Sequence, residues 1–196
     1  MVCVDKMLAL PIFISLSMIP VKIAGSGPPV IFQTGLFNRM PRFLYSRFLR
    51  DLGKSVSVIT TDRNPMDKEM IDTIARSIGA ESIGLVTHSG VRPSLVSNSR
   101  IERCVMLDPI AIPHMNTVDG VHAPRVTPCS PTHVIRTGAN RDGMVANAIS
   151  LQVDGASESS YDEAGHSDIL DNIFARIFSD MGMRGMNNAP TIQPFD

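Results

Sequence analysis

The stretch that decides the fold is Ile83–Pro93, I-G-L-V-T-H-S-G-V-R-P, an apolar run that leads into a polar turn centred on Ser89. A buried strand followed by His-Ser-Gly and a prospective helix is the layout of a nucleophile elbow, in which a sharp turn holds a serine hydroxyl above the end of a sheet. The usual pattern is G-x-S-x-G, and this chain has Thr87 and Val91 at the glycine positions. Both residues are β-branched, so we expect the elbow to be wider or differently strained.

Strand-like runs alternate with helical patterns on both sides of this stretch. Besides Ile83–Val86, strands are predicted at Val21–Ala24, Val30–Gln33, Val56–Thr60, Arg103–Leu107, Thr132–Thr137 and, weakly, Ser157–Tyr161. Helices are predicted at Arg39–Leu52, at Pro65–Ile78 with Asn64 as its cap, at Val91–Ser99 and after Ser167. Such alternation indicates an α/β fold, with a mostly parallel sheet that helices cover on both faces.

Length indicates a single domain, because 196 residues can bury one substantial core. We expect this domain to span residues 1–180. From Met181 to Asp196 the sequence is rich in Asn and Pro and has no hydrophobic period, which predicts an extended C-terminal tail. Such a tail is suited to docking on a protein partner.

Composition argues against several classes of function. The formal net charge is −1, so no nucleic-acid partner is expected. The three cysteines, Cys3, Cys104 and Cys129, are widely spaced and favour neither a disulfide framework nor a zinc site. The apolar run from Met7 to Val21 is interrupted by two prolines and is too short for a membrane span. Lys6 precedes this run as in a signal peptide, but Asp5 cancels its charge and no A-x-A-like cleavage site follows. Strands that lead into the core are therefore expected, with a cleaved leader as the alternative, and an intracellular location is favoured.

A base and an acid follow Ser89 in the sequence, each just after a predicted strand. His166 lies between the last strand and the last helix, and Asp142 lies just past Thr132–Thr137. Open parallel sheets place their sites at the carboxyl ends of the strands. The chain order Ser, Asp, His is the one found with nucleophile elbows.

With these residues the chain resembles the α/β-hydrolase superfamily, in a short form without a cap. The resemblance extends from about Ile19 to Phe178, and four pieces carry it: P-P-V-I-F-Q-T-G (28–35), S-I-G-L-V-T-H-S-G (82–90), R-C-V-M-L-D-P (103–109) and A-G-H-S-D-I-L-D (164–171). It implies a three-layer α/β-hydrolase-like sandwich. It also implies a serine hydrolase that acts on a carboxylic ester or related acyl compound, through an acyl-serine intermediate and without a cofactor.

The resemblance assigns roles to individual residues. Ser89 would be the nucleophile, His166 the general base and Asp142 the carboxylate that orients the imidazole. The backbone N–H groups of Gly90 and of Leu36, or of the next residue, would hold the oxyanion. From their positions near strand ends, an acyl pocket is expected to be lined by Phe37, Met40, Ile110 and Ile112.

Several alternatives stay open. Asp108, at the end of the preceding strand, could supply the carboxylate in place of Asp142, and Asp154 and Asp162 are more distant alternatives. His88 is expected to pack or hydrogen-bond locally. The remaining histidines lack a ligand-like spacing, so no metal is expected. The altered elbow also favours a second hypothesis, a catalytically weak or inactive protein of this fold that serves as a binding or assembly subunit.

Overall fold

The computed structural model describes residues 15–16, 19–62, 66–111, 125–138, 149–162, 164–168 and 170, and every structural statement below concerns these residues. The tail predicted from Met181 to Asp196 lies outside them, and of the predicted last helix only Asp168 and Leu170 are described. The extent of the domain therefore stays a prediction.

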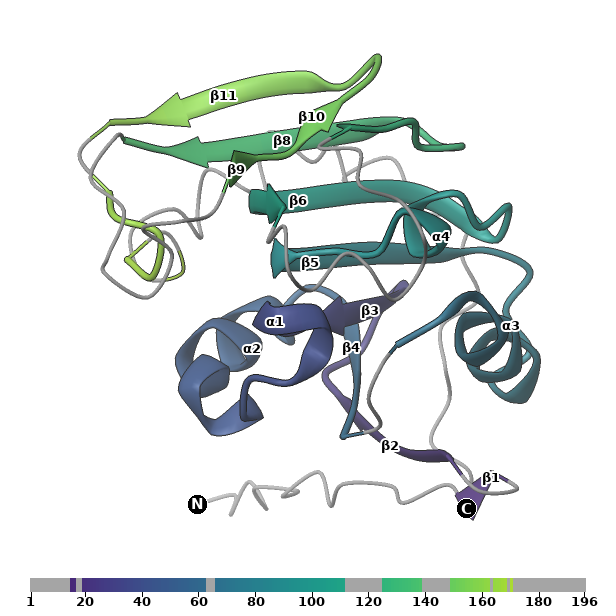
Figure 1. Ribbon diagram of the computed structural model, residues 1–196. Helices are drawn as coiled ribbons and strands as arrows, with labels where there is room; N and C mark the ends of the chain where they lie inside the picture. The colour runs from purple at the N-terminus through teal and green to yellow at the C-terminus, as the bar shows by residue number, and fades with distance from the viewer. Residues whose placement is uncertain are drawn as a thin grey trace, which may run out of the picture.

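A nine-stranded sheet forms the centre of the molecule (Figure 1). Eight strands follow the order β1-β2-β4-β3-β5-β6-β8-β11, and β9 pairs with β6. The neighbours from β4 to β11 are parallel, whereas β1, β2 and β9 pair antiparallel. The strands are β1 (Ser15–Leu16), β2 (Ile19–Ala24), β3 (Pro29–Gln33), β4 (Ser57–Thr61), β5 (Ile83–Gly90), β6 (Ile101–Ala111), β8 (Thr132–Thr137), β9 (Ile149–Ser150) and β11 (Ser157–Tyr161). A separate two-stranded sheet pairs β7 (Arg125–Val126) with β10 (Gln152–Val153).

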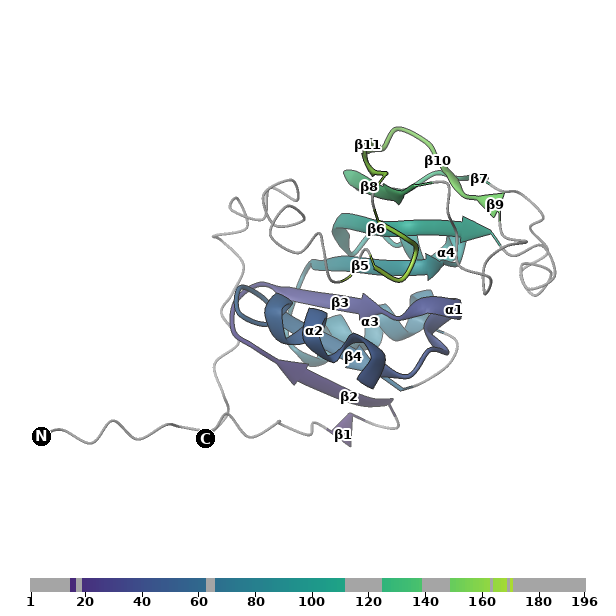
Figure 2. The ribbon, with the colours of Figure 1, turned by 90° about the vertical axis from the view of Figure 1, so that its left-hand side faces the viewer.

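Helices cover the sheet on both faces, as the alternation of patterns predicted. Figure 2 shows α2 (Ser46–Leu52) in front of the sheet and α3 (Lys68–Ser77) behind it. Successive residues of a strand point to opposite faces, so Ile31 of β3 packs in the core under α3 while Phe32 packs in the core under α2. Both cores are apolar, which is why the inner strands have continuous runs of buried residues.

Three predicted helix boundaries were wrong. The helix predicted from Arg39 begins later, because Pro41 is extended and a 3-10 turn, η1 (Arg42–Tyr45), precedes α2. Helix α3 is capped by Asp67, whose carboxylate accepts the N–H of Met70 at 2.8 Å, and not by Asn64. The helix after the elbow is only the single turn α4 (Pro93–Val96). In addition, β5 continues past the predicted end as far as Gly90, and β6 continues to Ala111.

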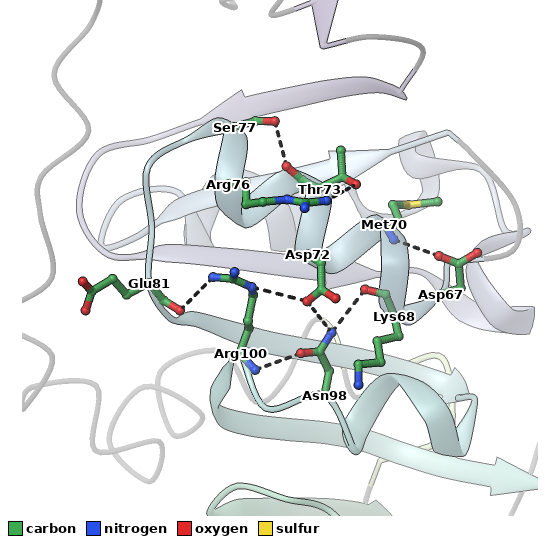
Figure 3. Close-up of polar contacts among 10 residues, drawn as sticks. All are labelled: Asp67, Lys68, Met70, Asp72, Thr73, Arg76, Ser77, Glu81, Asn98 and Arg100. Carbon is green, nitrogen blue, oxygen red and sulfur yellow. Dashed lines mark hydrogen bonds and ion pairs between the residues drawn. The ribbon is translucent and has the colours of Figure 1, made fainter.

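A buried asparagine joins α3 to the turn between α4 and β6 (Figure 3). The Asn98 amide donates to the Lys68 carbonyl and to Asp72 Oδ1, both at 3.2 Å. Its side-chain oxygen accepts the N–H of Arg100 at 2.8 Å. Asn98 is fully buried, so shortening its side chain would remove three hydrogen bonds and leave a cavity between α3 and this turn.

We therefore expect Asn98→Ala to lower the free energy of unfolding by about 1–3 kcal/mol. Urea denaturation followed by circular dichroism measures this loss. The control is Ser82→Ala, which removes an exposed hydrogen bond to Glu102 and should change stability by less than about 0.5 kcal/mol. Equal urea midpoints for Asn98→Ala and the wild type would contradict the structural role of this side chain.

Candidate active site

Ser89 lies at the carboxyl end of β5 in a strained backbone conformation. Its φ is 65°, in the left-handed region, which typically costs a residue other than glycine about 1–3 kcal/mol. The pairing of β5 with β6 shifts register between His88 and Gly90, so the chain turns sharply at the serine. Thr87 and Val91 are both buried beside this turn. The two β-branched residues are thus compatible with the sharp turn that an elbow requires.

His166 is paired with a buried carboxylate at the same edge of the sheet. His166 Nδ1 lies 2.5 Å from Asp108 Oδ2, and the two side chains are 6% and 3% exposed. Asp108 itself has a positive φ of 40°. Its carboxylate also accepts two hydrogen bonds from Thr137, from the backbone N–H at 3.3 Å and from the hydroxyl at 3.0 Å. Since an ionised carboxylate only accepts hydrogen bonds, Nδ1 is the protonated nitrogen of His166 when its ring is neutral.

The pKa of Asp108 lies below its ordinary value. Burial acts to raise this pKa, but the hydrogen bond and charge of His166 and the two bonds from Thr137 together outweigh burial. Asp108 is therefore ionised near neutral pH. An ionised carboxylate is the form that can orient an imidazole and stabilise its cation.

The lowered pKa makes part of the stability depend on pH. A carboxyl group whose pKa is lower in the folded than in the unfolded state stabilises the fold above its unfolded value, here near 3.8. This stabilisation is lost as the pH falls through the lower folded-state pKa. We expect the free energy of unfolding of the wild type to fall more steeply than that of Asp108→Asn between about pH 5 and pH 2.5. Urea titrations at several pH values measure both slopes, with exposed Asp162→Asn as the control; parallel curves for wild type and Asp108→Asn would refute the expectation.

The other candidate carboxylates are placed differently. Asp142, the orienting carboxylate that the sequence predicts, lies outside the described residues. Asp154 binds the Arg125 guanidinium at 2.7 Å and the Thr127 hydroxyl at 2.8 Å. Asp162 accepts the hydroxyl of Ser160 at 2.6 Å. Within the described part of the chain, Asp108 is the carboxylate in contact with His166.

No hydrogen bond joins Ser89 to His166, the expected nucleophile and base, in the described part of the structure. Among the described residues, the Ser89 hydroxyl has no hydrogen-bond partner at all. The serine is 4% exposed and His166 is 5% exposed. Catalytic hydrogen bonds are often long or misaligned without substrate and shorten when it binds.

The turn after β3 supplies backbone donors near the elbow. In α1 (Gly35–Asn38), Leu36 and Phe37 have φ values of 51° and 57°, so the turn is left-handed. The side chain of Asn38 holds it, accepting the N–H of Thr34 at 3.1 Å and donating to the Thr61 carbonyl at 3.0 Å. Among the described residues, the N–H groups of Leu36 and Phe37 have no hydrogen-bond partner. They are available to an oxyanion.

Two contacts fix the peptide groups that follow Ser89. Gln33 donates from Nε2 to the Gly90 carbonyl at 2.6 Å, and its side chain is buried. A Cβ atom at Gly90 would lie only 3.2 Å from the ring of Phe37, so glycine permits this ring to pack beside the elbow. The contact of Gln33 with the elbow was not predicted from the sequence. A polar residue at the end of an otherwise apolar strand was the available signal.

Of the residues expected to form an acyl pocket, two lie beside the elbow. Phe37 packs on Gly90, and Ile110 pairs with Gly90 in the sheet and is buried. Met40 is partly buried against the core under α2. Ile112 lies outside the described residues.

The described residues contain no group of three or more His, Cys, Asp or Glu side chains that could hold a metal ion. None of their helices has both the length and the apolar character needed to cross a membrane. Cys104 is buried in β6, where burial raises the pKa of its thiol to about 12, and Cys129 is exposed; neither forms a disulfide.

Comparisons with known proteins bear on the fold. No protein-family model matches the sequence, and no curated protein matches it significantly. Among solved structures, the chain is similar to carboxylesterase CesB from Bacillus subtilis, with a TM-score of 0.59 and 14% identity over 90% of this chain and 92% of that one. It is also similar to a meta-cleavage product hydrolase from Pseudomonas fluorescens, with a TM-score of 0.58 and 12% identity over 85% and 95% of the two chains. A third similar structure is an esterase from a marine microorganism, with a TM-score of 0.55 and 11% identity over 85% and 98%. These likenesses confirm the predicted fold class.

Proposed function

Because the chain has the α/β-hydrolase fold, we propose that it is a serine hydrolase acting on a carboxylic ester or related acyl compound. The observation that supports this most strongly is the buried His166–Asp108 pair at the same sheet edge as the strained Ser89. The structures cited above that the chain resembles are hydrolases. Because their sequence identity to this chain is low, they support the fold and not the proposed ester hydrolysis.

In the proposed reaction, Ser89 Oγ attacks the acyl carbonyl carbon while His166 Nε2 takes the hydroxyl proton. Asp108 holds the proton on His166 Nδ1 and stabilises the imidazolium that forms. His166 then gives its proton to the leaving alcohol, and an acyl-serine remains. Water, deprotonated by the same imidazole, then attacks the acyl carbon. The acyl–oxygen bond breaks, the imidazolium returns the proton to Ser89 Oγ, and the acid leaves.

The negative charge on the carbonyl oxygen needs hydrogen-bond donors in place before the reaction. We assign this role to the N–H of Gly90 and to the N–H of Leu36 or Phe37. The left-handed turn supports the assignment, because it leaves the last two groups without partners among the described residues. Donors that need no reorganisation account for a large share of the rate enhancement of acyl transfer.

The acyl group is expected to lie against Phe37, Met40 and Ile110.

Hydrolysis of p-nitrophenyl acetate, butyrate and octanoate, three esters that differ in the length of the acyl group, tests the proposed function. We expect release of p-nitrophenol above the background rate for at least one chain length. Folded protein that hydrolyses none of the three esters would argue against the activity.

A binding or assembly role is the second candidate. It is favoured by the absence of a Ser89–His166 hydrogen bond among the described residues, together with Thr87 and Val91 at the elbow's glycine positions. An active-site-directed fluorophosphonate separates the two functions, because only an activated serine reacts with it. A protein partner for the tail at 181–196 stays a proposal within this second candidate.

A further inference from the structure

A buried hydrogen-bond chain connects the turn after β3 with the segment that carries His166. The N–H of Gly35 donates to the Tyr45 hydroxyl at 2.8 Å. The same hydroxyl lies 3.0 Å from His88 Nδ1, and His88 Nε2 lies 3.1 Å from the backbone carbonyl of His166. Tyr45, His88 and His166 are each no more than 5% exposed. These hydrogen bonds cross the carboxyl ends of the neighbouring strands β3 and β5.

The chemistry of the end groups sets the direction of these hydrogen bonds. The His166 carbonyl can only accept, so His88 Nε2 carries a proton and donates it. In a neutral ring Nδ1 then accepts, and the Tyr45 hydroxyl donates to it. Burial raises the pKa of Tyr45, against the opposing influence of the Gly35 N–H, so the phenol keeps the proton it donates.

His88 also contacts the imidazole of His166 directly. The two ring centroids lie 4.7 Å apart with an interplanar angle of 30°. Asp108 fixes the His166 ring at Nδ1, while His88 supports its face and holds its backbone carbonyl. Both nitrogens of His88 are engaged in hydrogen bonds, so His88 is not the base.

Glycine at position 35 leaves the space that these hydrogen bonds need. A Cβ atom there would lie 2.9 Å from the Tyr45 oxygen and 3.5 Å from His88 Nδ1. The same glycine begins the left-handed turn that carries the N–H groups of Leu36 and Phe37. The base and the oxyanion donors are therefore joined through one continuous set of buried contacts.

We infer that His88 is a positioning residue for His166. Through Tyr45, it also holds His166 at a fixed position relative to the left-handed turn at Leu36 and Phe37. The catalytic consequence rests on the proposed hydrolase function. The structural consequence, a His88 that donates from Nε2 to the His166 carbonyl, does not.

Three variants distinguish the hydrogen bond between Tyr45 and His88 from the one between His88 and the His166 carbonyl. In His88→Asn the amide reaches only as far as Nδ1, so the bond to Tyr45 can be kept while the bond to the His166 carbonyl is lost. In His88→Gln the amide nitrogen reaches the position of Nε2 and can restore that bond. Tyr45→Phe removes a single oxygen, and with it both the acceptor for Gly35 and the donor to His88.

Ester kinetics give the first readout. We expect His88→Asn to lower kcat by about 10- to 100-fold, the scale on which small misplacements of reacting groups act, with KM within about twofold. His88→Gln should recover most of the loss, and Tyr45→Phe should lower kcat by about tenfold. His133→Asn is the matched control, because His133 lies on β8 and bonds to Ser157 and Ser159 of the edge strand β11. We expect it to leave kcat unchanged.

Nitrogen-15 NMR of histidine-labelled protein gives a readout that needs no activity. We expect wild-type His88 as the neutral tautomer protonated at Nε2. The His166 signals should shift in His88→Asn, and the His133 signals should not. An Nδ1-protonated His88, or a His88→Asn variant with wild-type kcat and unshifted His166 signals, would overturn the inference. A wild type without esterase activity but with the expected tautomer and His166 shifts would refute the proposed hydrolase and support the positioning contact.

Discussion

Ser89→Ala is expected to lower kcat/KM for ester hydrolysis by about 10⁴-fold or more, because in the proposed mechanism the acyl intermediate forms on this hydroxyl. The folded state should be kept, since the substitution removes one oxygen that has no hydrogen-bond partner among the described residues. Initial rates with p-nitrophenyl butyrate and thermal unfolding, measured on the same preparations, check both halves of this prediction.

Ser157→Ala is the matched control for the nucleophile. Ser157 also lies next to a histidine, with its hydroxyl 2.8 Å from His133 Nδ1, but it belongs to the edge strand β11 and has no positive φ. We expect it to keep wild-type activity. If Ser89→Ala kept its activity, the assignment of the nucleophile would be lost whatever the control showed.

Asp108→Asn is the second change with a large expected effect. An asparagine amide can donate to His166 Nδ1, which moves the imidazole proton to Nε2 and removes the base. It also removes the negative charge that stabilises the imidazolium. We expect kcat to fall by about 10³- to 10⁴-fold, with a smaller change in KM.

Asp142→Asn tests the alternative that the sequence favoured. If Asp108 is the orienting carboxylate, Asp142→Asn should retain activity within a few-fold of the wild type. The reverse pattern, a large loss in Asp142→Asn and little change in Asp108→Asn, would return the role to Asp142. Loss in both variants would call for thermal unfolding of each, and a folded Asp142→Asn without activity would count against Asp108 as the sole acid.

The sequence was informative wherever hydrophobic patterning determines the structure. The strands at Thr132–Thr137 and Ser157–Tyr161 have the bounds that their residues predicted. The alternation of strands and helices predicted the parallel sheet and placed Ser89 at the carboxyl end of a strand. These features depend on local sequence and on general rules of chain topology.

Features that depend on tertiary contacts could not be derived in the same way. Asp108 and Asp142 both follow predicted strands, and the positive φ that accompanies the contact of Asp108 with His166 leaves no mark in its sequence. The left-handed turn at Leu36 and Phe37 lacks the glycines that normally signal it. Tyr45 was part of a predicted helix, and only the fold shows that its hydroxyl meets His88.

The central claim is that the hydroxyl of Ser89 is an activated nucleophile. Incubation with a fluorophosphonate, followed by intact-mass analysis and peptide mapping, tests this claim most directly. We predict one adduct per chain, located on Ser89, absent from Ser89→Ala and strongly slowed in Asp108→Asn. Folded wild-type protein that forms no adduct, or forms one on another residue such as Ser157, would contradict the account.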